Sequence, residues 1–109
     1  LSKMKIQKTF GETVKILREE KKLTLREVAE ALEIDTSMLG KIEKNSRKPN
    51  KVLIENFAKF FNVKEKDLTI SFLSDSVAYK ILDEDYPIEV LKVTEEKVQY
   101  LITKKNLNP

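Results

Sequence analysis

The sequence predicts an all-α protein in which a five-helix domain is followed by a helical C-terminal extension. Apolar residues recur every three or four positions through most of the first 70 residues, as on the buried face of a helix. Polar residues that typically cap helix N-termini, Thr24, Asp35 and Asn50, precede three of these apolar runs. The length of 109 residues suits one small domain with an appendage. We place the domain at residues 9–69 and the extension at residues 70–109.

The first helix is expected from Phe10 to about Lys21. Phe10, Val14 and Leu17 lie at helical spacing, and no proline interrupts the chain before Pro49. These three residues are therefore candidates for the core.

A capping box marks the start of the second helix. In Thr24-Leu-Arg-Glu27 the threonine accepts a hydrogen bond from an otherwise unpaired amide, and the glutamate side chain reaches back. We expect this helix to end near Leu32. Asp35 then caps a third helix over roughly 36–44.

Asn50 is expected to cap a fourth helix after the proline-terminated loop "NSRKP". Its apolar face carries Val52, Leu53, Phe57 and Ala58, with Phe60 or Phe61. The stretch "NVKEKDL" indicates a fifth helix starting near Lys64.

The C-terminal residues allow two structures. Residues 74–82 resemble a further short helix, and residues 87–103 a longer one, because proline is tolerated at a first helical position. Near-heptad apolar spacing supports the longer helix, although Glu95 interrupts it. The alternative for the same residues is a β-hairpin that turns at Glu95 and Glu96.

The composition argues against an enzyme. The chain contains no histidine, the commonest general base and metal ligand, and no cysteine for a disulfide or a thiolate zinc site. Its two glycines cannot form a phosphate-binding loop of a known kind. We expect no catalytic residue, no metal and no cofactor.

No apolar run approaches the roughly 18 residues that a membrane span needs, and no signal peptide is recognisable. Residues 1–8 read as a leader that carries three lysines. We expect a cytoplasmic protein that does not bind membranes.

Positive charge is concentrated in the first part of the chain. Residues 1–66 contain 16 Lys or Arg against 10 Asp or Glu, whereas residues 67–109 contain 5 against 8. This asymmetry indicates that one part of the molecule binds a polyanion.

The segment from Leu25 to Lys44 has the pattern of a helix-turn-helix, in which two short helices meet across a turn of about three residues. Ala29 lies where the two helices would cross, and its small side chain lets the backbones approach. The positions that such a pair must bury are all apolar: Val28, Ala29, Leu32, Ile34, Leu39 and Ile42.

Four stretches resemble the lambda-repressor-like (Xre/Cro) family of bacterial and phage regulators: "FGETVKILRE", "LTLREVAEAL", "IDTSMLGKIEKNSRKPN" and "LIENFAKFFNV". The resemblance covers about Phe10 to Leu68. It implies a DNA-binding domain that acts as a homodimer on inverted repeats, with its third helix reading bases. Two positions depart from the family: Leu25 replaces a frequent phosphate-binding glutamine, and Glu33 replaces a frequent glycine in the turn.

The resemblance assigns roles to three sets of residues. The expected base-reading residues are Thr36, Ser37, Gly40 and Lys41. The expected phosphate-binding residues are Lys44, Ser46, Arg47, Lys48, Asn50 and Lys51. Arg18 and Glu43 are expected to form a structural ion pair between the first and third helices.

Apolar residues after residue 70 are too numerous for an exposed arm, so we expect them to form a dimer interface that includes Val77, Ile81, Leu91, Val98 and Ile102. The predicted function is a sequence-specific regulator, or repressor, that binds double-stranded DNA as a homodimer. Control of a restriction–modification operon is one role that fits its size. The alternative is an antitoxin or adaptor whose extension binds a different protein.

Overall fold

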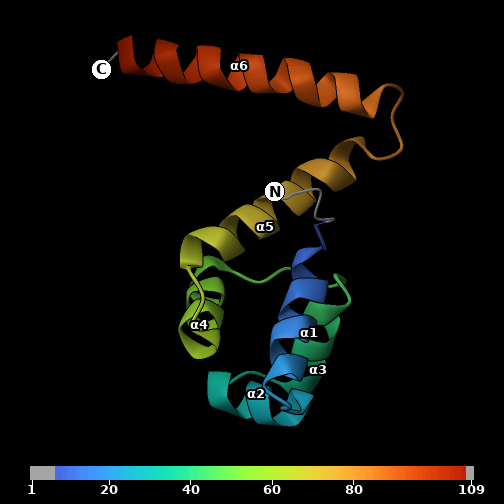
Figure 1. The fold of residues 1–109 in the computed structure, drawn as a ribbon, viewed down its shortest axis with the longest axis vertical. Helices are drawn as coiled ribbons and strands as arrows, with labels where there is room; N and C mark the ends of the chain where they lie inside the picture. Colours follow the sequence, from blue (N-terminus) through green and yellow to red (C-terminus); the bar gives the residue numbers. More distant parts are fainter. Residues whose placement is uncertain (1–6, 108–109) are drawn as a thin grey trace. The chain divides into compact units, whose positions relative to one another are not determined.

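The computed structural model describes residues 7–107, and all the secondary-structure elements in this range are α-helices (Figure 1). The first six residues of the expected lysine-bearing leader lie outside the described residues. The helices are α1 (Phe10–Glu20), α2 (Leu25–Leu32), α3 (Thr36–Glu43), α4 (Lys51–Phe61), α5 (Glu65–Ile81) and α6 (Pro87–Leu107). The all-α prediction is confirmed.

The chain divides into two units between Asp75 and Ser76. Unit 1 contains α1 to α4 and the first part of α5, and unit 2 contains the end of α5 and all of α6. Among the described helices, none combines the length and the apolar character required to cross a membrane.

The core of unit 1 is built around Phe57, which is completely buried. Phe10 packs edge-on against Phe57 with the ring centroids 6.1 Å apart, and the Phe61 ring stacks with that of Phe57 at 6.3 Å. Every helix of the unit contributes to this core, whose buried apolar members are Phe10, Val14, Val28, Ala29, Leu39, Ile42, Leu53, Ile54, Phe57, Ala58, Phe61 and Leu68.

Side-chain caps define the starts of three helices. Thr9 forms a capping box with Glu12 at α1, Thr24 forms one with Glu27 at α2, and Asn50 accepts from the Leu53 amide at 2.8 Å. Hydrogen bonds from the Thr9 backbone and hydroxyl groups lower the pKa of Glu12 below its ordinary value. The capping role expected of Asp35 is wrong in one respect: it occupies the N-cap position of α3, but its side chain makes no capping hydrogen bond.

Four helices end in the same way, with one residue in the left-handed region. Lys22, Glu33, Asn45 and Asn62 have φ values between 57° and 63°. After α2, for example, the Ile34 N–H donates to the Ala29 carbonyl and the Glu33 N–H to that of Glu30, which is a Schellman motif. Asparagine tolerates this conformation, whereas lysine and glutamate adopt it at a cost of about 1–2 kcal/mol.

The N-terminus of α1 lies against the end of α3. The Gly11 N–H donates to Asn45 Oδ1 at 2.9 Å, and Asn45 Nδ2 donates to Thr9 Oγ1 at 2.9 Å. A Cβ atom at position 11 would lie 2.6 Å from the Glu43 carbonyl oxygen, closer than real side chains come. Only glycine permits this contact between α1 and α3.

An ion pair joins the same two helices farther along. Arg18 Nε and Nη2 donate to the two carboxylate oxygens of Glu43 at 2.8 and 3.0 Å, and Arg18 Nη1 donates to the Leu23 carbonyl at 2.9 Å. The hydrogen bonds to Glu43 raise the pKa of Arg18 above its ordinary value. Both side chains are largely buried, with 12% and 5% of their surfaces exposed.

The separate short helix expected over residues 74–82 is wrong, because α5 continues without a break to Ile81. The polar residues that suggested a boundary are accommodated within the helix. The Ser74 hydroxyl donates to the Ser71 carbonyl at 3.0 Å, and Asp75 Oδ2 accepts from the Phe10 N–H at 2.7 Å. Leu68 and Phe72 anchor the N-terminal part of α5 in the core of unit 1.

The β-hairpin alternative for the last residues is also wrong. The chain turns at Tyr86, which has a positive φ, and α6 then runs for 21 residues from Pro87 as one uninterrupted helix (Figure 1). Thr94 and Thr103 donate their hydroxyl hydrogens to carbonyls one turn earlier, so these β-branched residues are satisfied within the helix. No side chain of α6 is buried.

The two glycines provide a matched test of this packing. Gly11→Ala should destabilise the protein by about 1–3 kcal/mol, because a methyl group there overpacks the contact between α1 and α3. Gly40→Ala should stabilise it by up to about 1 kcal/mol, because a Cβ there meets no atom within 4 Å and alanine favours the helix. Urea unfolding of both variants measures the difference, and a stabilising Gly11→Ala would contradict the close approach.

The ion pair has its own matched test. Glu43→Gln should lower the free energy of unfolding by about 3 kcal/mol, because it leaves the Arg18 charge poorly compensated in a buried site. Glu30→Gln breaks the exposed pair with Arg26, whose side chains are 82% and 70% exposed, and should change stability by less than about 0.5 kcal/mol. Equal effects in thermal or urea unfolding would show that burial is not what makes the Arg18 pair important.

Candidate nucleic-acid interface

α2 and α3 form a helix-turn-helix in which the turn is short and fixed. Glu33 ends α2 in the left-handed region that glycine prefers, and Thr36 is already the first residue of α3. Ala29 is buried at the contact between the two helices. Glutamate at position 33, where glycine would be unstrained, therefore strains the turn without preventing it.

α3 has two sharply different sides. Leu39, Ile42 and Glu43 are buried against unit 1. The opposite side comprises Thr36, Ser37, Gly40 and Lys41, which lie within about 140° of one another at 3.6 residues per turn. Thr36, Ser37 and Lys41 are exposed, and Gly40 is half-buried. The four residues expected to read bases thus lie on one accessible helix face.

Nothing inside the protein requires glycine at position 40. A Cβ there would meet no atom within 4 Å, and the residue has no positive φ. Glycine in a helix interior costs about 1 kcal/mol relative to alanine. Gly40 therefore makes α3 less stable than alanine would. Gly11 differs, because a methyl group at position 11 has no space.

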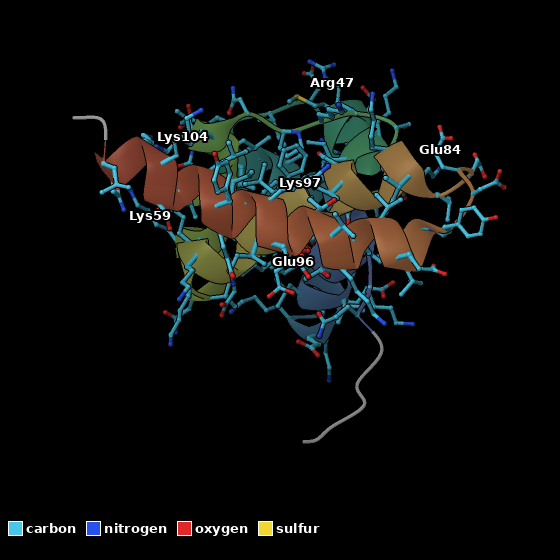
Figure 2. All side chains as sticks on the ribbon, turned by 90° about the horizontal axis from the view of Figure 1, so that it is seen from above. Arg47, Lys59, Glu84, Glu96, Lys97 and Lys104 are labelled. Atoms are coloured by element: carbon cyan, nitrogen blue, oxygen red, sulfur yellow. The ribbon has the colours of Figure 1, made fainter. Side chains whose placement is uncertain are left out.

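The segment after α3, residues 44–51, carries the expected phosphate-binding residues. Lys44, Arg47, Lys48 and Lys51 are exposed, and Pro49 is buried beneath them. Figure 2 shows the Arg47 side chain extending away from the ribbon. Neither of the ion pairs found within residues 7–107 involves these four cations. The segment directly after α3 therefore presents four exposed cations.

Two members of the expected phosphate-binding set already have partners in the fold. The Ser46 hydroxyl donates to the Lys41 carbonyl at 3.2 Å and so helps to end α3. The Asn50 side chain caps α4 through its carbonyl oxygen, which leaves its amide group exposed at the helix N-terminus.

Two residues that position this face were missed in the sequence. Asn45 connects the end of α3 to α1, and its sequence signal is an asparagine directly after a helix, where left-handed residues are common. Asp75 accepts a hydrogen bond from the first amide of α1, although the two residues are 65 positions apart in the sequence. No local sequence pattern predicts such a contact.

The residues expected at a dimer interface belong to unit 2. Val77, Leu91, Val98 and Ile102 are exposed, and Ile81 is half-buried. Within the described residues no group of three or more acidic side chains is placed to hold a metal ion.

A protein-family model described as helix-turn-helix matches residues 14–68, just over half of the chain. Searches of curated proteins and of solved structures gave no significant match. The matched residues include the whole of α2, α3 and the segment 44–51. From the match and from the geometry of α2 and α3, the chain belongs to the lambda-repressor-like (Xre/Cro) helix-turn-helix family of DNA-binding regulators.

Proposed function

We propose that this protein is a sequence-specific transcriptional regulator that binds an inverted-repeat operator as a homodimer. The observation that carries the proposal is Gly40, an unforced glycine in the middle of the exposed face of α3. A missing side chain at that place lets the helix backbone approach the edge of a base pair closely. The proposal thus gives a reason for a residue that the fold alone does not need.

The polar residues around Gly40 read the bases in the major groove. The Thr36 and Ser37 hydroxyls donate or accept hydrogen bonds, and the threonine methyl group contacts a thymine methyl group. Lys41 binds the acceptor atoms of guanine. α3 is only eight residues long, so one copy reads a few base pairs.

The segment 44–51 holds the sugar–phosphate backbone. Lys44, Arg47, Lys48 and Lys51 supply charge, and the exposed amide of Asn50 donates to a phosphate at the N-terminus of α4. Such contacts set affinity and register but carry little sequence information. Ser46 contributes mainly by holding the end of α3 in place.

A dimer supplies the specificity that one short helix lacks. Each mismatched base pair costs about 1–3 kcal/mol, so doubling the number of base pairs read greatly increases discrimination. Two copies related by a two-fold axis would read half-sites about 10 bp apart. In this proposal residues 9–69 bind DNA and residues 70–109 dimerise, and repression of a restriction–modification operon is one fitting role.

The exposed apolar side chains of unit 2 also fit a second candidate, an antitoxin or adaptor that binds a different protein. Tyr79, Leu82 and Tyr86 are each more than half exposed, as are several residues of α6. Such a surface needs a partner of some kind. A chain that remains monomeric in solution would favour this second candidate.

Selection from random duplex DNA at moderate salt tests the proposed function. The intact protein should enrich an inverted repeat. Thr36→Ala, Ser37→Ala and Lys41→Ala should each lose preference at particular positions, at about 1–3 kcal/mol per lost base contact. Arg47→Ala and Lys48→Ala should weaken binding to all sequences equally and reduce the slope of log affinity against log salt by about one unit.

Lys59→Ala is the control for charge alone, since Lys59 is exposed near the opposite end of α4 from Asn50. It should retain the affinity, the selected sequence and the salt dependence of the intact protein. If α3 and segment 44–51 variants behave alike, the assignment of base and phosphate contacts is wrong. If the intact protein enriches no sequence, sequence-specific binding itself is wrong.

A further inference from the structure

Asp35 occupies the N-cap position of α3 but does not cap the helix with its side chain. Its backbone carbonyl accepts the first hydrogen bond of the helix, from the Leu39 N–H at 3.1 Å, whereas its carboxylate accepts none from the amides that follow. The N-cap residues of α1, α2 and α4 all make that side-chain bond. A side-chain cap stabilises a helix, so α3 forgoes a gain that the other three helices have.

The Asp35 carboxylate is exposed and has no partner within residues 7–107. It belongs to neither of the ion pairs in that range. The other acidic residue between positions 35 and 51, Glu43, is buried and binds Arg18. Asp35 is therefore the one exposed carboxylate in a stretch whose other exposed charges are positive, those of Lys41, Lys44, Arg47, Lys48 and Lys51.

A carboxylate at this place is unfavourable for binding DNA in general. The phosphates of any duplex repel it, so it lowers the affinity for every sequence. The helix dipole favours an acidic residue at the start of α3, but serine and asparagine cap helices about as well without a charge. A contact with one kind of base gives the carboxylate a use, because it then adds discrimination between sequences in exchange for some affinity.

A carboxylate distinguishes the four bases by the groups that they present in the major groove. When ionised it only accepts hydrogen bonds. Cytosine presents the N4 amino donor and no acceptor, whereas guanine presents two acceptors, N7 and O6, and thymine presents the O4 acceptor beside a methyl group. Adenine is intermediate, because its N6 donor lies beside its N7 acceptor. The order of preference is therefore cytosine, then adenine, with guanine and thymine last.

We propose that Asp35 is a specificity-determining residue whose carboxylate accepts a hydrogen bond from the N4 amino group of a cytosine. The inference rests on the proposed function and adds to it one base contact and the identity of the base. Asp35 directly precedes Thr36 and Ser37, and it is the N-terminal residues of a recognition helix that contact base edges. The operator then contains one such cytosine in each half of its inverted repeat.

Asp35→Asn tests the contact, because asparagine has the same shape and is an equally good N-cap residue. Its amide also donates, and it pairs with N6 and N7 of adenine. In selection from random duplex DNA, the intact protein should enrich cytosine at one position of each half-site. The variant should enrich adenine or no base there and keep its other preferences. In competition binding, exchange of that cytosine for guanine should weaken the intact protein by roughly 5- to 10-fold.

Asp67→Asn is the matched control, because Asp67 is likewise an exposed aspartate near the start of a helix of unit 1. It removes the same charge and should enrich the same sequence as the intact protein. Asp35→Ser is a second test variant, since serine also caps helices but carries no carboxylate, and it should lose the cytosine preference as well. Urea unfolding of the three variants establishes that each retains the fold.

The outcomes separate this contact from the proposed function. Loss of the cytosine preference in both Asp35 variants, and its retention in Asp67→Asn, supports the contact. An unchanged preference in Asp35→Asn would overturn the contact and leave the proposed function intact. Loss of preference at every position would overturn it too, because Asp35 would then act through the placement of α3, and the same loss in Asp67→Asn would assign the effect to net charge. If the intact protein enriches no sequence, both proposals are wrong.

Discussion

The close contact between α1 and α3 is the constraint on which the proposed DNA-binding face depends. α3 has eight residues, too few to be stable as an isolated helix, so its position must be fixed by its surroundings. Gly11 lets the backbones of the two helices meet, Asn45 joins the end of α3 to the start of α1, and Arg18 binds Glu43. These three contacts anchor the C-terminal half of α3 at several points, while Leu39 and Ile42 bury its inner side.

In the proposed function, this anchoring leaves the outer side of α3 free to bind DNA rather than to stabilise the helix. The exposed face contains a glycine, small hydroxyl side chains and a lysine, none of which helps the helix to form. The left-handed Glu33 and the uncapped N-terminus of α3 are further local costs at the same place. The surrounding core compensates for them, as is usual where a functional surface departs from the best local sequence.

Local signals in the sequence were sufficient to predict the first four helices, because each signal acts over three or four residues. Capping residues mark the starts of α2 and α4, and apolar spacing identifies the inner sides of α1 and α4. The exposed face of α3 follows from the same spacing. The contact of Asp75 with Phe10 could not be predicted, because the two residues are distant in the sequence, and it is one reason that α5 continues through a polar stretch.

The secondary structure of the C-terminal unit was harder to predict, for a different physical reason. α6 buries no side chain, so no core positions select between a helix and a hairpin from the sequence pattern. A single uninterrupted helix resolves that choice, and it also reveals which side chains share a face.

An NMR titration of the labelled protein with duplex DNA would test the central claim most directly, because backbone amide shifts report on each residue separately. The claim predicts that the largest changes occur in the first part of α3, around Thr36, Ser37, Gly40 and Lys41, and in segment 44–51. Amides of α6 should change little. Large changes confined to α6, or spread evenly over all lysines, would contradict the assignment of α3 as the helix that reads DNA.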